Sequence, residues 1–145
     1  NQLKGFKDVI DDITGTMNGI GWVISGFSLL VGGFGIANIM FVSVKERTNL
    51  IGIQKSLGAK NKFILFQFLF EAVILSLIGG LIGLILVFIV SVAASSFSGD
   101  FNFVLSPWNM FLGTAISAII GLISGIIPAI SASKLDPVEA IRTGQ

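Results

Sequence analysis

Few residues of this 145-residue chain could do chemistry. The sequence contains no Cys and no His, so it lacks thiols, the commonest general base and the commonest transition-metal ligand. No carboxylate pair lies in its long apolar segments, and no Gly-rich loop ending in Gly-Lys-Ser/Thr is present to hold a nucleoside triphosphate. These features argue against an enzyme, and we expect no cofactor or metal.

Glu71 is the only charged residue in the apolar segment at 63–97. It could be a carboxylate that lines a transport pathway or couples motion across the membrane. The alternative, which we favour, is a carboxylate near the membrane interface, either snorkelling or paired with a basic residue such as Lys45 or Arg47. A position near the end of a span lowers the cost of desolvation. The apolar segments also lack a polar stripe that could line an aqueous path.

The basic residues are concentrated in one segment, Lys45–Lys62, which carries five Lys/Arg and one acid. Of the whole chain, 53% is hydrophobic and only 12% is charged, whereas a soluble domain has about 25% charged residues. The segment therefore connects membrane spans, and basic loops next to spans stay in the cytoplasm. A net charge of +1 gives no sign of nucleic-acid binding.

A short helix is predicted inside this basic segment. Thr48 or Asn49 can cap its start, and Gly58 is typical of the position just after a helix. Its apolar residues fall on one face, which we expect nothing in the chain to cover. Such a face needs a partner, so we predict a docking element; the alternative is a helix on the membrane surface. The face consists of Leu50, Ile53 and Leu57, with Arg47, Lys55 and Lys60 at its rim.

Three apolar segments are long enough to cross a bilayer. They cover residues 20–44, 63–97 and 106–130 and predict an all-α transmembrane domain over 19–145. Residues 1–18 predict an amphipathic helix, either a stalk or an interfacial helix. Seven Lys/Arg fall on the side of the basic segment and two on the other, which places that segment and the C-terminus in the cytoplasm.

Small residues recur every four positions in the spans. They let two helix backbones approach closely, so we expect these faces to pack against other helices. The second apolar segment is longer than a bilayer needs, so either its first turns lie in the interface or it bends at Gly79-Gly80. The small residues are Gly113, Ser117, Gly121 and Gly125 in the third span and Gly79, Gly80 and Gly83 in the second.

Two Pro-containing sequences mark helix starts near the C-terminus. Ser106-Pro107 predicts the start of the third span, with Ser as N-cap and Pro as the first helical residue. Asp136 followed by Pro predicts a last short helix, Pro137–Arg142. Pro128 should kink or end the third span. Between the second and third spans, Ser98–Leu105 predicts a short loop.

Several short motifs occur in a specific order and spacing. Together they resemble the FtsX-like permease domain of MacB-type ABC transporters over most of residues 20–142. The chain departs from the family pattern at Leu50, Gln54 and Ser56, where Glu, Arg and Ala are usual, and this favours a more apolar contact there. The motifs are Glu46-Arg47-Thr48, Ile51-Gly52-Ile53, Gly58-Ala59, Phe68-Leu69, Glu71-Ala72, Gly79-Gly80 with Gly83, Pro128-Ala129, and the tail Asp136-Pro137-Val138-Glu139-Ala140-Ile141-Arg142.

The resemblance implies a permease of the bacterial cytoplasmic (inner) membrane. It would couple ATP hydrolysis to extracytoplasmic conformational change in the efflux or extrusion of drugs, peptides or lipoproteins. Implied partners are a cytoplasmic ABC ATPase, fused or separate, a second permease copy, the lipid bilayer and optionally a periplasmic adaptor. A first span and an outer domain would precede residue 1. The alternative is an FtsX-like regulator of cell-wall hydrolases in cell division. The predicted ATPase contacts are Arg47, Asn49, Leu50, Ile53, Gln54, Leu57, Gly58, Ala59 and Lys60.

Overall fold

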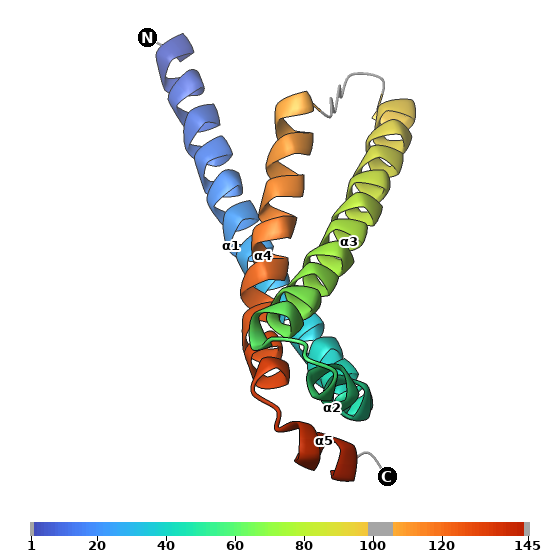
Figure 1. Cartoon of the computed structure of the whole chain (residues 1–145). Coiled ribbons are helices and arrows are strands. Elements are labelled where there is room, and N and C mark those ends of the chain that lie inside the picture. Colours follow the sequence, from blue (N-terminus) through green and yellow to red (C-terminus); the bar gives the residue numbers. More distant parts are fainter. Residues whose placement is uncertain (1, 99–105, 144–145) are drawn as a thin grey trace. The chain divides into compact units, whose positions relative to one another are not determined.

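This computed structural model describes residues 2–98 and 106–143, which form helices without strands (Figure 1). The predicted all-α fold is therefore confirmed. Three of the helices, α1, α3 and α4, are long and apolar enough to span a membrane, as predicted. Apart from Ser98, the predicted loop lies outside the described residues. The helices are α1 Gln2–Glu46, α2 Thr48–Ser56, α3 Asn61–Ser98, α4 Pro107–Ser133 and α5 Pro137–Thr143.

Two compact units make up the chain, residues 1–32 and 33–145. The first unit is the N-terminal part of α1, and its large apolar side chains are exposed, among them Phe6, Trp22 and Phe27. No break separates the predicted amphipathic helix from the first span, because α1 is one continuous helix. The second unit contains the rest of α1 and helices α2 to α5.

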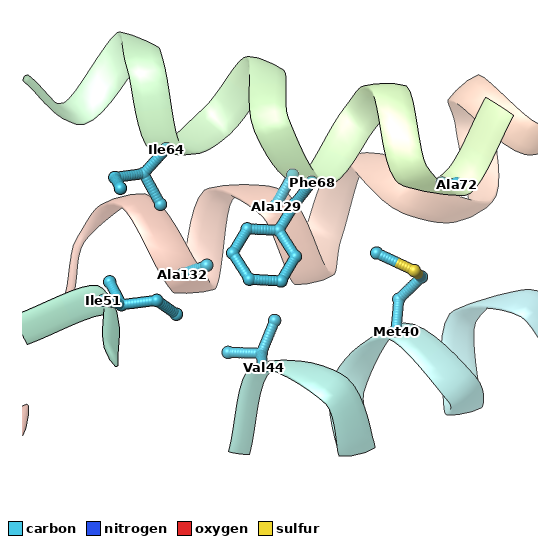
Figure 2. Packing of buried hydrophobic residues seen from close by; sticks show 8 residues of the cluster. All are labelled: Met40, Val44, Ile51, Ile64, Phe68, Ala72, Ala129 and Ala132. Carbon is cyan, nitrogen blue, oxygen red and sulfur yellow. The ribbon is translucent and has the colours of Figure 1, made fainter. Parts of the chain in front are cut away.

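The core of the second unit lies where α2 meets α1, α3 and α4. Figure 2 shows the ring of Phe68, from α3, in the middle of this cluster, with Met40 and Val44 of α1 facing it. Phe68 and Met40 are almost completely buried. Burying a large apolar side chain stabilises a fold by about 1.5–3 kcal/mol. The cluster therefore fixes the position of the short helix α2. Its members are Met40, Val44, Ile51, Ile64, Phe68, Ala72, Ala129 and Ala132.

The predicted signals at the start of α4 are confirmed. Ser106 is the N-cap, and its side-chain oxygen accepts a hydrogen bond from the backbone N–H of Asn109 at 3.2 Å. Pro107 is the first helical residue. Pro128 does not end the helix, which continues to Ser133, and its ring is fully buried.

The third helix, α3, runs through Gly79-Gly80 without a break. Its 38 residues span about 57 Å at 1.5 Å per residue, nearly twice the hydrocarbon thickness of a bilayer. Its first turns carry Ile64 and Phe68, which belong to the core around α2. The first turns of α3 are therefore covered by protein rather than by lipid alone.

Candidate functional site

The helix α2 begins without a side-chain cap. Its N-cap position is Arg47, which is the only residue between α1 and α2. The hydroxyl of Thr48 donates to the carbonyls of Val44 and Lys45, both at 2.9 Å. The predicted cap at Thr48 or Asn49 is therefore wrong, because the Thr48 hydroxyl bonds the last turn of α1 instead of an N–H of α2.

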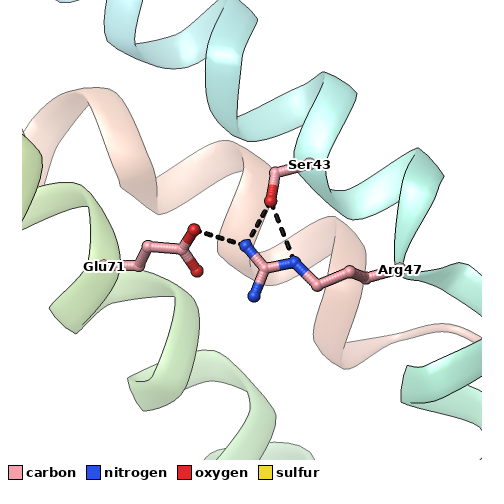
Figure 3. A network of polar contacts seen from close by, with 3 residues as sticks. All are labelled: Ser43, Arg47 and Glu71. Carbon is pink, nitrogen blue, oxygen red and sulfur yellow. Dashed lines mark hydrogen bonds and ion pairs between the residues drawn. The ribbon is translucent and has the colours of Figure 1, made fainter.

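Arg47 points toward α3. Its guanidinium forms an ion pair with Glu71 of α3 and donates to the hydroxyl of Ser43, with Nε 3.1 Å from Oγ (Figure 3). Its Cζ also lies 5.1 Å from the ring centroid of Phe68, which is the geometry of a cation–π contact. The favoured interpretation of Glu71, a carboxylate paired with a basic loop residue, is confirmed with Arg47 as its partner. The ion pair connects the junction of α1 and α2 to α3.

Lys55 caps the end of α4. Its ammonium donates to the carbonyl of Leu135 at 2.7 Å and to the carbonyl of Ser133, the last residue of α4. The last carbonyls of a helix have no donors within the helix, and a cation there also interacts favourably with the helix dipole. Burial lowers the pKa of Lys55, while the nearby carboxylate of Asp136 acts to raise it.

Gly52 gives α5 a flat surface on α2. A Cβ on Gly52 would lie 2.9 Å from Cβ of Ala140 and 3.0 Å from both Cγ1 of Ile141 and the carbonyl oxygen of Pro137. Any side chain at this position would push α5 away. One side of α2 is therefore covered, because α5 packs on the side that carries Gly52. The expectation of an uncovered face concerned the other, apolar side, whose Leu50, Ile53 and Leu57 remain exposed as predicted.

The cap of α5 follows the prediction. The side chain of Asp136 accepts a hydrogen bond from the backbone N–H of Val138 at 3.1 Å, and Pro137 is the first helical residue. The carboxylate of Asp136 thus holds the start of α5 next to Lys55, which contacts the same turn of chain.

The opposite side of α2 stays exposed. Leu50, Ile53 and Leu57 are 57%, 42% and 84% exposed. The helix ends at Ser56, and Gly58 follows its C-cap Leu57. The φ of Gly58, +106°, lies in the left-handed region, so its predicted role just after the helix is confirmed. The other predicted contact residues are distributed between surface and interior: Lys60 is exposed, whereas Arg47, Asn49, Gln54 and Ala59 are partly buried.

Small residues of α4 lie directly against α3. A Cβ on Gly121 would lie 2.8 Å from Cβ of Ser76 and 3.0 Å from the carbonyl oxygen of Ala72. A Cβ on Gly125 would lie 2.5 Å from Cβ of Ala72. These distances are too short for real side chains, so the two backbones approach as closely as the small-residue rule describes.

The remaining small residues are less uniform. A Cβ on Gly80 would lie 2.5 Å from Oγ of Ser117, and one on Gly113 would make an ordinary contact with a neighbouring Leu at 3.8 Å. Among the described residues, no atom lies within 4 Å of a Cβ built on Gly79 or Gly83. Those two glycines therefore do not pack against another helix in the part of the chain that the structure describes.

Sequence reasoning missed two contacts of α2. Gly52 could have been found, because a glycine inside a helix costs about 1 kcal/mol relative to Ala and often marks a close approach of another element. The contact of Lys55 has no local signal, since its partners lie 78 and 80 residues away along the chain.

Residues 22–137 match the family described as FtsX-like permease C-terminal. The chain belongs to this family. The predicted resemblance is thus confirmed for the segment from the first span through the α4–α5 turn.

Two relatives illustrate where FtsX-like permease chains of this kind are found. The chain is 48% identical over 134 residues to the Uncharacterized ABC transporter permease YknZ of Bacillus subtilis, covering 92% of this chain and 33% of that protein. It is 42% identical over 135 residues to the Macrolide export ATP-binding/permease protein MacB of Agrobacterium fabrum, covering 93% of this chain and 21% of that protein. The FtsX-like chain therefore spans between a fifth and a third of these relatives' length. Its relatives and its three candidate spans indicate that it is a bacterial membrane protein.

Proposed function

We propose that this chain is the membrane part of an ABC permease that couples ATP hydrolysis in the cytoplasm to conformational change on the other side of the bacterial inner membrane. Membership of the FtsX-like family and the likeness to ABC permeases support this role. The ATPase belongs to a separate or fused part outside this chain. The cargo class is a drug, peptide or lipoprotein that is extruded, and a second permease copy completes the assembly.

The observation that carries the proposal is the two-sided environment of α2. Its inner side is held by protein, through Lys55 at the end of α4 and through Gly52 at α5. Its outer side presents Leu50, Ile53 and Leu57 to solvent. An exposed apolar face of this kind marks an interaction site. In this proposal the face seats in a cleft of the cytoplasmic ATPase.

The competing interpretation is a helix that rests on the membrane surface. The two interpretations differ in what sets the orientation of α2 about its own axis. A surface helix rotates until its apolar side enters the lipid. The orientation of α2 is set instead by its protein contacts, with Arg47 fixed to Glu71 just before the helix and Lys55 fixed in its last turn. This fixed orientation favours a protein partner that matches the outer face.

The proposal is tested by placing a charge on the outer face. Leu50→Asp and Leu57→Asp are made in the full-length permease and purified with its ATPase. A carboxylate buried without a partner costs several kcal/mol, so we expect co-purification and transport to fall at least about tenfold while the ATPase retains its intrinsic hydrolysis.

Val138→Asp is the matched control, because Val138 is 70% exposed on α5 and the change is the same apolar-to-acid substitution. It should bind the ATPase and transport like the parent. Unchanged co-purification and transport in both α2 variants would refute docking through this face.

A further inference from the structure

The contacts of α2 raise the question of how a movement of this helix could reach the rest of the membrane domain. The chain joins α2 to α1 through one residue, Arg47, and to α3 through residues 57–60. No such short connection joins α2 to α4, since the two contacting residues Lys55 and Ser133 are 78 positions apart. Motion can therefore pass from α2 to α4 only through non-covalent contacts.

Besides the packing of Ile51 in the core with Ala129 and Ala132 of α4, two kinds of contact make this connection, and they lie on one side of α2. The ammonium of Lys55 binds two carbonyls at the α4–α5 turn, at Ser133 and Leu135. Charge-assisted hydrogen bonds of this type are about twice as strong as neutral ones. One turn earlier, Gly52 lies flat against Ala140 of α5. The polar contact and the apolar contact together hold α2 against the end of α4 and the start of α5.

We propose that Lys55 is a positioning residue that makes α2, the last turn of α4 and α5 move as one body, so that a displacement of α2 is passed to α4. The proposal rests on the proposed function, because the cytoplasmic ATPase is the part that displaces α2. From its last turn, α4 passes the displacement to α3 through the close contact of Gly121 with Ser76.

Lysine suits this position chemically. Its compact ammonium carries three donors at the end of a four-carbon stem, so it can bind two carbonyls that converge on one point. Methionine keeps a similar unbranched stem but has no donor. Lys55→Met would therefore remove the polar part of the connection and leave the outer face of α2 unchanged.

The functional test uses Lys55→Met and Lys55→Arg in the full-length permease, reconstituted with its ATPase. In Lys55→Met we expect co-purification and ATP hydrolysis close to the parent, with transport per ATP hydrolysed about five- to tenfold lower, which corresponds to a typical coupling between sites. Lys55→Arg keeps donors and charge and should restore most of the transport. Lys62→Met removes an exposed lysine at the start of α3 and should behave like the parent.

A distance measurement tests directly whether α2 and the end of α4 move as one body, first in the protein with Lys55 unchanged and then in Lys55→Met. Spin labels on Ser56→Cys and Lys134→Cys, both exposed positions in a chain without cysteine, report the separation of α2 and the end of α4. We expect one narrow distance distribution that is the same without nucleotide and with a non-hydrolysable ATP analogue. The distribution should broaden in Lys55→Met. A distance that changes with nucleotide in the parent, or a Lys55→Met variant with parental transport per ATP, would overturn the proposal.

The two proposals fail in different measurements. Docking through the outer face fails when Leu57→Asp keeps its ATPase, and the spin-label distance does not depend on that result. The Lys55 connection fails when the label distance is variable or insensitive to Lys55→Met, even where Leu57→Asp loses the ATPase.

Discussion

Gly121 of α4 lies so close to Ser76 of α3 that a Cβ on the glycine would be 2.8 Å from Cβ of the serine. The two helices therefore meet backbone to side chain, with no room for a methyl group. Extra atoms in a well-packed contact cost about 1–3 kcal/mol, and a branched side chain facing a backbone costs more. The α3–α4 pair thus depends on this position being glycine.

Gly121→Ile should separate α3 from α4 and lower the stability of the domain by about 3 kcal/mol. Gly83→Ile is the matched control, since no described atom lies within 4 Å of a Cβ on Gly83. Thermal unfolding and monodispersity in detergent would measure both variants. A Gly121→Ile protein as stable as Gly83→Ile would show that the close contact does not exist.

The ion pair of Arg47 with Glu71 should appear as coupling in a double-mutant cycle. Both side chains are 33% exposed, so solvent screens the pair, and we expect a coupling energy of about 1 kcal/mol from Arg47→Met and Glu71→Gln. Equilibrium unfolding in mixed micelles gives the four free energies. The cycle of Lys45→Met with Glu71→Gln is the control and should be additive within about 0.5 kcal/mol. Equal coupling in both cycles would mean that the pairing is not specific.

Gln67 should tolerate loss of its amide. Its Oε1 is buried and has no hydrogen-bond partner among the described residues. An unpaired buried acceptor costs about 1–3 kcal/mol, so Gln67→Leu should leave the domain equally stable or stabilise it by about 1 kcal/mol. Gln67→Glu, which puts a charge at the same place, should destabilise it. A clear loss of stability in Gln67→Leu would indicate that the oxygen has a partner.

The two ends of α3 should lie on opposite sides of the membrane. Ser56, just before α3, and Ser96, near its end, are both exposed and can be changed to Cys singly in this cysteine-free chain. With the basic segment in the cytoplasm, an impermeant thiol reagent added to intact cells should label Ser96→Cys and not Ser56→Cys. Permeabilised cells provide the control in which both label. Labelling of both positions in intact cells contradicts the predicted topology.

Local signals predicted the ends of several elements correctly. Gly58 ends α2 because only a residue without Cβ adopts its positive φ at little cost, and Ser106 and Asp136 begin α4 and α5 because their side chains bond free N–H groups. Each of these depends on residues within a few positions, so the sequence contains the whole interaction. The three spans could also be predicted from the sequence, since length and apolar composition define them.

The inner side of α2 could not be predicted in this way. Its contacts join Gly52 to Ala140 and Lys55 to Leu135, which lie about half the chain apart. A periodic pattern in the sequence indicates local structure only, so it does not predict such contacts. The error at Thr48 has a related cause, because a hydroxyl that can cap a new helix can equally bond the last turn of the preceding one. Because α1 ends one residue before α2, the Thr48 hydroxyl bonds the last turn of α1 instead of capping α2.

Pro128 gives the end of α4 a mechanical property of its own. Proline has no N–H, so the carbonyl of Ser124 lacks its usual donor four residues later, and the helix has one fewer hydrogen bond at this turn. Bending costs least where that bond is missing. The last turn of α4, which Lys55 holds, is therefore joined to the turn that carries Gly121 through the one point where the helix lacks a backbone hydrogen bond.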